Sequence, residues 1–246
     1  DGQLDYGETI NIDVTIKNIG AKEANDIDVE LVSKSEYVTM TKANATIATL
    51  GANETAAIKD MFEFKVADNV PDQEELSFDI LCEAGEQSWT TDFSIVANAP
   101  KFELDTIYVR NQIIEPGTGA TLFVAVRNNG HSEARNLKVE MMSCSADLNF
   151  IEPIVTEEFL PAGDVVEIVA DFESDEKVQS GTVFEVLCSL KAGNYEFNSN
   201  YYITIGQSME DFETGDFSKT DWQFEGDANW LISGGAYEGA YCAKSG

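Results

Sequence analysis

Positive charge is scarce in this sequence, which has 15 lysine and arginine residues against 45 aspartate and glutamate residues and a formal net charge of −30. This balance argues against binding to nucleic acids or to an anionic membrane surface, because both are polyanions. The acidic residues occur in every part of the chain rather than in one tail, which is typical of a solvated, highly soluble surface. Cationic partners, calcium included, remain compatible with this charge.

Long hydrophobic runs are also missing. No stretch approaches the roughly 20 apolar residues that a membrane-spanning helix needs, so we expect no membrane insertion. The chain opens on Asp1-Gly2, without an initiator methionine and without the basic and apolar regions of a signal peptide. We therefore expect it to be a segment of a longer protein.

Histidine occurs once, as His131, and the four cysteines form no CxxC pair and have no neighbouring histidine. The spacing typical of metal sites is absent, and zinc is not expected. A cysteine peptidase needs a thiolate within hydrogen-bond reach of a histidine, and His131 follows Gly130 in a segment that we expect to be an exposed loop. We predict that this chain has no catalytic residues and is not an enzyme.

An internal repeat is the dominant feature of what is present. At an offset of 110 residues, one register holds over more than fifty residues, with the pairs Gly7/Gly117, Asn18/Asn128, Gly20/Gly130, Leu50/Leu160 and Phe62/Phe172. The second copy is then shorter by four residues, and the matches continue in Phe78/Phe184 and Cys82/Cys188; after a second slip, Trp89 matches Phe197 at an offset of 108. Both slips fall between expected strands, where loops tolerate changes of length.

Apolar residues recur at every second position within each copy, for example over residues 10–16 and 122–126. This period is typical of half-buried antiparallel strands. Further strands are expected at 26–33, 55–66, 76–82 and 88–97, with counterparts at 136–143, 165–172, 182–190 and 195–205. About seven short strands in about 100 residues favour an immunoglobulin-like sandwich. We predict an all-β fold with two tandem immunoglobulin-like β-sandwiches, residues 1–98 and 99–206.

The repeated Asn-x-Gly motif is interpreted as a sharp corner after a strand. Gly20 and Gly130 are predicted to be structural turn residues, because glycine and asparagine accept positive φ at little steric cost. Residues 101–109 form an additional first strand in the second copy, whereas the first copy begins at the equivalent turn. The first sandwich is therefore expected to lack its opening strand, and the unpaired edge is a place for strand addition.

The cysteines are assigned by the repeat. Cys82 and Cys188 hold matching positions and share the parity of core-facing neighbours, so both are predicted to be small core hydrophobes. A bridge between Cys144 and Cys188 would exist in one copy only and remains open. Cys242 has no visible partner.

Residues 207–246 differ from the repeats in composition. Strand fragments with aromatic residues are expected at 222–224, 230–232 and 236–243, separated by Gly-Asp and Gly-Gly turns. Because a segment of about 40 residues is too short to complete a sandwich alone, we interpret it as the start of a truncated domain.

The tail carries a resemblance to a known family. The runs Phe212-Glu213-Thr214-Gly215-Asp216-Phe217, Asp227-Ala228-Asn229-Trp230 and Tyr237 to Gly246 resemble the opening of the jelly-roll adhesin domains of gingipain-type surface proteins. The duplicated sandwiches are similar to the immunoglobulin-like modules of the bacterial cell-adhesion (CARDB-like) kind that follow gingipain-type cysteine peptidases. The resemblance implies a partial jelly-roll over 207–246 and a secreted, bacterial cell-surface parent protein, although this chain has no peptidase domain.

Two candidate sites in the tail follow from these residues. The resemblance implies a structural calcium ion, for which Glu213, Asp216 and Asp227 are the candidate ligands; no other cofactor is expected. The aromatic side chains of Trp222, Trp230 and Tyr237 are candidates for a sugar-binding platform, with core packing as the alternative.

The function predicted from the sequence is that of a non-catalytic spacer and adhesion segment. Rigid β modules in series would hold a neighbouring peptidase or adhesive domain away from the cell, and the partners would be neighbouring domains of the parent protein and a host protein or glycan. The alternative is a carbohydrate-binding module that uses the aromatic residues of the tail.

Overall fold

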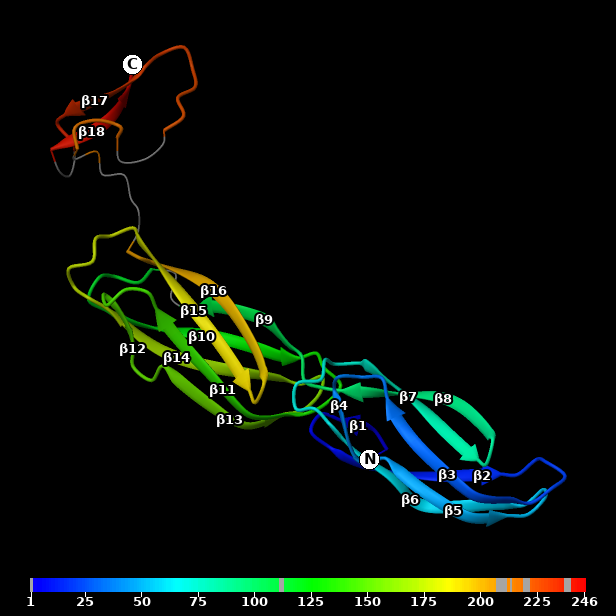
Figure 1. Ribbon diagram of the computed structural model, residues 1–246. Coiled ribbons are helices and arrows are strands. Elements are labelled where there is room, and N and C mark those ends of the chain that lie inside the picture. Colours follow the sequence, from blue (N-terminus) through cyan, green and yellow to red (C-terminus); the bar gives the residue numbers. More distant parts are fainter. Residues whose placement is uncertain (1, 111–112, 207–211, 213, 219–221, 237–239) are drawn as a thin grey trace.

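The computed structural model describes residues 2–110, 113–206, 212, 214–218, 222–236 and 240–246, and every helix or strand in these ranges is a β-strand (Figure 1). The predicted all-β class is confirmed. Within the described ranges, no helix has the length and apolar character that would be required to cross a membrane.

The first sandwich packs two sheets around one core. Strands β1, β8, β7, β3 and β5 form one sheet in that order, and β2, β6 and β4 form the other. The strands are β1 (Leu4–Asp5), β2 (Thr9–Lys17), β3 (Ala24–Ser33), β4 (Val38–Lys42), β5 (Asn44–Leu50), β6 (Thr55–Val66), β7 (Glu74–Ala84) and β8 (Gln87–Asn98). All pairings are antiparallel except the short parallel pairing of β1 with β8.

The second sandwich also has eight strands: seven repeat strands of the first, β1 has no counterpart among the described strands, and one strand has no equivalent in the first sandwich. Its sheets have the orders β12–β14–β10–β9 and β13–β11–β15–β16, and Figure 1 shows β9 beside β10. The strands are β9 (Phe102–Val109), β10 (Gly119–Asn128), β11 (Ala134–Ser143), β12 (Leu148–Phe150), β13 (Ile154–Leu160), β14 (Val165–Ser174), β15 (Thr182–Ala192) and β16 (Tyr195–Ile205).

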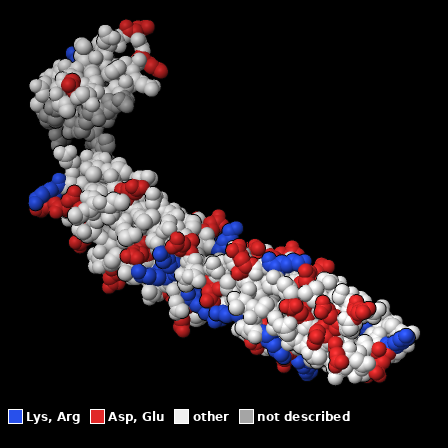
Figure 2. Space-filling model, viewed as in Figure 1, with Lys and Arg blue, Asp and Glu red and all other residues white. Residues whose placement is uncertain are grey.

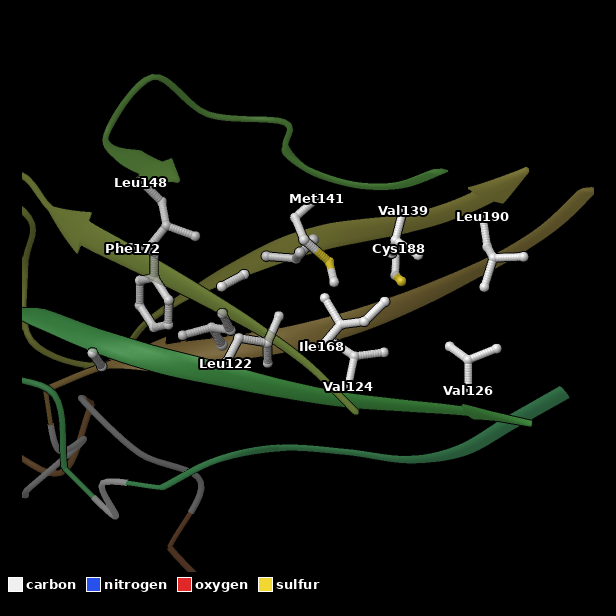
Figure 3. Close-up of a cluster of buried hydrophobic side chains, with 14 of the residues drawn as sticks. Leu122, Val124, Val126, Val139, Met141, Leu148, Ile168, Phe172, Cys188 and Leu190 are labelled. Carbon is white, nitrogen blue, oxygen red and sulfur yellow. The ribbon is translucent and has the colours of Figure 1, made fainter. Parts of the chain in front are cut away.

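The alternating pattern of the strands produces the core of each sandwich. In the second sandwich, the core-facing side chains of β10 point toward those of the opposite sheet (Figure 3). Val124 lies across from Cys188 and Val139 in this view, and all three are at most 1% exposed. Cys188 is therefore a core residue as predicted, whereas Cys82 is only half-buried. The predicted match of the two cysteines is wrong: Cys82 pairs with Val29, and Cys188 pairs with Met141, which is the repeat partner of Leu31 and not of Val29.

Several strand predictions were accurate and others were wrong. The ranges of β6 and β16 match the expected strands, whereas β4, β5, β12 and β13 were missed. Strands β4, β5 and β13 contain threonine or acidic residues and bury few side chains, so their alternation is weak. Strand β12 has only three residues, which is too few to show a period. In the tail, the strand expected at 222–224 is not regular structure; a hairpin is formed by β17 (Trp230–Gly234) and β18 (Tyr241–Ser245).

The corner after β2 is held by the side chain of its asparagine. Asn18 donates its Nδ2 to the carbonyl oxygens of Lys22 at 2.8 Å and Leu50 at 3.0 Å. Its Oδ1 accepts the Gly20 N–H at 2.9 Å. One side chain therefore satisfies three backbone groups of the bend.

The corner after β10 has the same hydrogen bonds. Asn128 donates to the carbonyl oxygens of Ser132 at 2.9 Å and Leu160 at 3.1 Å, and accepts the Gly130 N–H at 3.1 Å. Both glycines lie at bends, but neither Gly20 nor Gly130 has a positive φ. Our physical reason for the motif was wrong: the asparagine side chain holds the corner, and left-handed backbone conformation is not involved.

Charge is distributed over the molecule as the sequence indicated. Figure 2 shows acidic side chains scattered over the visible face of both sandwiches, with lysine and arginine side chains among them. The described ion pairs are mostly at exposed positions, for example Arg127–Asp105 at 2.9 Å and Lys34–Asp79 at 2.6 Å. Exposed pairs of this kind contribute about 0–1 kcal/mol each, so they do not determine the fold.

Candidate functional site

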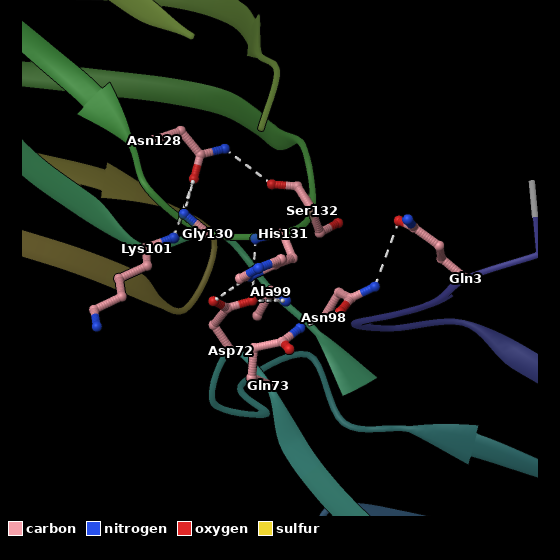
Figure 4. Close-up of polar contacts among 10 residues, drawn as sticks. All are labelled: Gln3, Asp72, Gln73, Asn98, Ala99, Lys101, Asn128, Gly130, His131 and Ser132. Atoms are coloured by element: carbon pink, nitrogen blue, oxygen red, sulfur yellow. Dashed lines mark hydrogen bonds and ion pairs between the residues drawn. The ribbon is translucent and has the colours of Figure 1, made fainter. Parts of the chain in front are cut away.

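The most elaborate polar site in the described residues lies where the two sandwiches meet (Figure 4). The linker from β8 to β9 contains Ala99 and Lys101, and Ala99 is fully buried in the core of the first sandwich. The Ala99 N–H donates to Asp72 Oδ1 at 3.0 Å, on the first sandwich. The Lys101 N–H donates to Asn128 Oδ1 at 3.1 Å, on the second. The linker is thus bonded to both sandwiches and is not a free tether.

Asp72 of the first sandwich and His131 of the second contact each other beside the linker. We call this region, residues 99–101 with the side chains that cross between the sandwiches, the joint. Asp72 lies between β6 and β7, and His131 lies in the corner after β10. The His131 ring Nδ1 is 2.9 Å from Asp72 Oδ2, and the His131 N–H donates to Asp72 Oδ1 at 3.1 Å. The Asp72 carboxylate therefore accepts hydrogen bonds from the linker and from the second sandwich.

Burial of Asp72 opposes its ionisation, but three hydrogen bonds outweigh this effect. The Ala99 N–H, the His131 ring and the His131 N–H together lower the pKa of the Asp72 carboxyl below its ordinary value. The charged form of Asp72 is consequently the form that stabilises the joint.

A pair of tyrosines crosses the joint in both directions. Tyr6 of the first sandwich donates its hydroxyl to the Glu133 carbonyl oxygen at 3.1 Å, and Tyr195 of the second donates to the Val70 carbonyl oxygen at 2.8 Å. The two rings meet edge to face, with centroids 5.2 Å apart and planes at 79°. Desolvation by burial raises the pKa of both hydroxyls, so both remain hydrogen-bond donors at neutral pH.

Three side-chain amides, from Gln73, Asn98 and Gln3, form a row of hydrogen bonds next to the linker. Gln73 donates its Nε2 to Asn98 Oδ1 at 2.6 Å, and Asn98 Nδ2 lies 3.5 Å from Gln3 Oε1 (Figure 4). Asn98 is 8% exposed at the end of β8. The residues before the linker are therefore tied to the N-terminal segment and to the β6–β7 loop.

Gly130 has a role in the joint that its repeat partner Gly20 lacks. A Cβ placed on Gly130 would lie 2.2 Å from the Ala99 carbonyl oxygen and 2.5 Å from the Lys101 nitrogen. The same atom on Gly20 would meet only Asn18 Oδ1, at 3.1 Å. The linker backbone packs directly on Gly130, and a side chain there would separate the sandwiches.

Sequence reasoning did not find the residues of the joint. His131 lies in an exposed loop as predicted, but its contact with Asp72 was not predicted, and no local pattern marks Asp72, Tyr6 or Tyr195 as a site residue. A usable signal was present: His131, Tyr6 and Tyr195 occupy positions at which the repeat partners are Ala21, Pro116 and Gln87. At these three positions, a difference between the repeats coincides with a contact of one repeat with the other.

The aromatic residues of the tail lie around a hollow of about 560 Å³ lined by Phe212, Phe217, Trp222, Gln223, Phe224, Glu225, Trp230 and Ala243. Trp222 and Trp230, both candidates from the sequence, are 43% and 45% exposed. Trp222 and Phe224 lie with ring planes 21° apart. The structure therefore brings two of the three predicted aromatic residues together, and Tyr237 lies outside the described residues.

The proposed calcium ligands do not form a recognisable site within the described part of the tail. Asp216 Oδ1 accepts the Ser218 N–H at 2.9 Å and the Ser218 hydroxyl at 2.5 Å, and these bonds lower the pKa of Asp216. Asp227 is exposed, and Glu213 lies outside the described residues. No group of three or more candidate metal ligands occurs among the residues that the structure describes, so calcium at these residues stays a prediction.

The cysteines are free thiols. Cys144 is exposed and Cys188 is buried, so the bridge that the sequence left open is not formed. Burial raises the pKa of the Cys188 thiol to about 11 and also raises the pKa of Cys82. Both thiols are therefore protonated at neutral pH, the form that is a poor nucleophile.

Comparisons with known proteins add little to this geometry. No family model and no curated protein matches the sequence. Among solved structures, red sea bream transglutaminase is similar with a TM-score of 0.35 and 13% sequence identity, over 84% of this chain and 30% of that chain. This chain spans less than a third of that protein, and a likeness at this level supports no conclusion about function.

Proposed function

We propose that this chain is a non-catalytic spacer segment that holds neighbouring domains of a larger protein at a fixed distance and orientation. The observation that supports the proposal is the joint between the sandwiches. Its contacts come from the linker, from the β6–β7 loop, from the corner after β10 and from two tyrosines that donate across the boundary. A joint with this many directional bonds resists bending, whereas interfaces between domains ordinarily permit relative motion.

The proposed spacer would work through the rigidity of the two sandwiches and of the joint between them. Each sandwich is a stiff unit because its two sheets enclose one continuous apolar core. The joint places the two units end to end (Figure 1), so a displacement at one end is transmitted to the other. The high negative charge keeps such an extended surface soluble.

The setting of this spacer is part of the proposal. The resemblance to the modules that follow gingipain-type peptidases implies a secreted parent protein at a bacterial cell surface, in which the partners are its neighbouring domains. A hydrogen-bonded, disulfide-free joint would operate without dependence on the redox conditions of that environment.

Small-angle scattering and residual dipolar couplings on the full chain test the spacer function. We expect a single alignment tensor to describe the amides of residues 4–98 and 102–205. Two tensors of different magnitude would show that the sandwiches move independently and would refute the proposal. The double substitution Asp72→Ala and Tyr195→Ala is the positive control, since it removes contacts from both sides of the joint.

A second candidate function is carbohydrate binding by the tail, which the aromatic hollow at residues 212–243 favours. Trp222 and Trp230, 43% and 45% exposed, line the hollow beside the polar groups of Gln223 and Glu225. A sugar ring could contact aromatic and hydrogen-bonding groups there. A glycan-array signal that is lost in Trp230→Ala and retained in Trp89→Ala, an exposed tryptophan of the first sandwich, would support it. Absence of binding to any glycan would exclude it.

A further inference from the structure

A stripe of apolar side chains runs across the outer face of one sheet of the second sandwich. Its members come from β13, β11, β15 and β16 and are Ile154, Met142, Leu187, Val183 and Tyr202; we call them the apolar stripe. Met142 pairs with Leu187, and the residues before and after Leu187 belong to the core. Because side chains alternate between the two faces of a strand, the stripe points away from the core. Four of its members are 42–59% exposed, and Leu187 is half-buried.

The first sandwich has a polar surface at the equivalent positions. Strand pairing matches the stripe, in the same order, to Asn44, Val32, Asp79, Glu75 and Ser94. Asp79 forms an ion pair with Lys34 at 2.6 Å, and the second sandwich has Cys144 in the place of Lys34. The second sandwich therefore has apolar groups where the first has charges, in a chain whose net charge is −30.

A domain docked end to end would not cover this stripe. The first sandwich has such a neighbour, which is held through the linker and the β6–β7 loop. Glu75 and Ser94 lie at the positions of Val183 and Tyr202, and both are exposed although the joint is formed. The exposure of the stripe therefore follows from its place on the outer side of the sheet, which a joint of this kind leaves open.

One acidic side chain lies inside the stripe. Glu185 is flanked on the same face of β15 by Val183 and Leu187, and the first sandwich has a serine at its position. Glu185 Oε1 accepts hydrogen bonds from Asn200 Nδ2 at 2.8 Å and from the Tyr202 hydroxyl at 3.4 Å. The ion pairs among the described residues do not include Glu185. The stripe thus surrounds a carboxylate whose charge is not neutralised by any described side chain.

This arrangement specifies the chemistry of a partner. Covering an uncompensated carboxylate with apolar groups alone is unfavourable, because the charge loses its hydration. A partner that covers the stripe therefore has to bring a cation to Glu185 and apolar groups to its surroundings. A second copy of this chain would bring another net charge of −30, and nucleic acids or anionic membranes would also add negative charge. The complementary partner is a polypeptide surface with one basic residue among apolar side chains.

We propose that the apolar stripe binds a polypeptide that presents an arginine or lysine flanked by apolar side chains. The basic group would pair with Glu185, and the apolar groups would cover Met142, Leu187 and Tyr202. Tyrosine and methionine are enriched in protein interfaces, and the flexible methionine side chain adapts to the shape of a partner. This binding activity is separate from the spacer function, and its failure would leave the spacer proposal intact.

The first test selects ligands without assuming their sequence. Random dodecapeptides displayed on phage are selected on the full chain and depleted on the double variant Cys144→Lys with Leu187→Asp. This variant introduces the ion-pair residues of the first sandwich without changing the net charge. We expect the remaining sequences to share an arginine or lysine with apolar residues on both sides. An empty selection, or sequences without a basic residue, would refute the proposal.

The second test measures the charge pairing. The most frequent selected peptide is synthesised with a fluorophore, together with a copy in which an uncharged analogue replaces the basic residue, citrulline for arginine or norleucine for lysine. Fluorescence anisotropy should show roughly tenfold weaker binding of the uncharged copy to the unmodified chain. Glu185→Gln should bind both peptides equally, because the charge pair is absent from either complex. A preference that persists in Glu185→Gln would refute the pairing of the cation with Glu185.

Two neighbouring methionines locate the bound peptide. In the full chain with carbon-13 methionine methyl groups, the Met142 resonance should shift on binding, whereas that of Met141, which is 2% exposed, should not. Tyr202→Ser should weaken binding roughly tenfold. Trp89→Ser removes an exposed ring of the first sandwich and is the matched control, which should bind as the unmodified chain does.

The outcomes that would contradict the proposal are distinct. Shifts confined to another methionine would place the peptide elsewhere, and equal binding by Tyr202→Ser and Trp89→Ser would show that the stripe is not used. Sedimentation without peptide tests self-association. Dimers that the double variant abolishes would also refute the proposal, because a second copy would then cover the stripe.

Discussion

Replacing Tyr195 by alanine is the most direct perturbation of the joint, because this side chain combines a hydrogen bond with a ring contact across the boundary. The hydroxyl donates to the Val70 carbonyl oxygen at 2.8 Å, and the ring meets Tyr6 edge to face at 5.2 Å. A neutral hydrogen bond contributes about 1 kcal/mol and an aromatic pair about 1 kcal/mol. The substitution should therefore destabilise docking of the sandwiches by about 2 kcal/mol, before any loss of buried area.

This magnitude predicts a measurable change in the docked population. About 2 kcal/mol corresponds to a roughly 30-fold shift of the ratio of docked to undocked molecules. Nitrogen-15 relaxation reports it, since docked sandwiches share one rotational correlation time and undocked ones tumble separately. Tyr195→Phe removes the hydroxyl only and should cause about half of the free-energy change.

The control for this experiment is Tyr202→Ala on the same strand, β16. Tyr202 is 59% exposed, and its hydroxyl donates to Glu185 of its own sandwich at 3.4 Å. This substitution should leave the correlation time unchanged. If Tyr195→Ala and Tyr202→Ala behave alike, the tyrosine pair does not hold the joint and our reasoning about its stiffness is wrong.

Three further predictions concern the same region. Gly130→Ala should destabilise the chain by about 1–3 kcal/mol through the clash with the linker, whereas Gly20→Ala should be nearly neutral; urea unfolding of both variants checks this. Asn128→Ala should cost about 2–4 kcal/mol, because four backbone groups lose their partner, and thermal unfolding measures it. The pKa of Asp72 is lowered in the folded chain, so its ionised form contributes fully to folding stability above the unfolded pKa of about 3.9, and this contribution is lost as the pH falls through the lower folded pKa. The difference in unfolding free energy between the unmodified chain and Asp72→Asn should therefore shrink below about pH 4. A difference that does not depend on pH would contradict this.

Much of the fold could be predicted because it depends on short-range patterns. Alternation in residues 10–16 and its recurrence at residues 120–126 identify strands and their duplication, since a period of two places one set of side chains on one face. The expectation of a missing first strand came from the same comparison of repeats. Strands such as β12, with three residues, were missed because they are too short to show a period.

The candidate sites were predicted less well than the fold, because they depend on contacts between residues far apart in the sequence. Trp222 and Trp230 were proposed together because aromatic residues are conspicuous in a short tail. The Asn-x-Gly corners were recognised, but the mechanism was assigned to glycine φ when the side chain of Asn128 holds the bend. A hydrogen bond from a side chain to a carbonyl group 32 residues away cannot be predicted from a local sequence pattern.

The sequence alone determined the all-β class, the duplication and the parity of the core residues, because these follow from the two-residue period of a strand. Only the tertiary structure decided that Asp72 meets His131, 59 residues apart, and that Tyr6 meets Tyr195. Contacts of this kind depend on the relative placement of two folded units. That placement is set by the packing of the linker against Gly130, and backbone packing at such distances is not encoded in any local pattern.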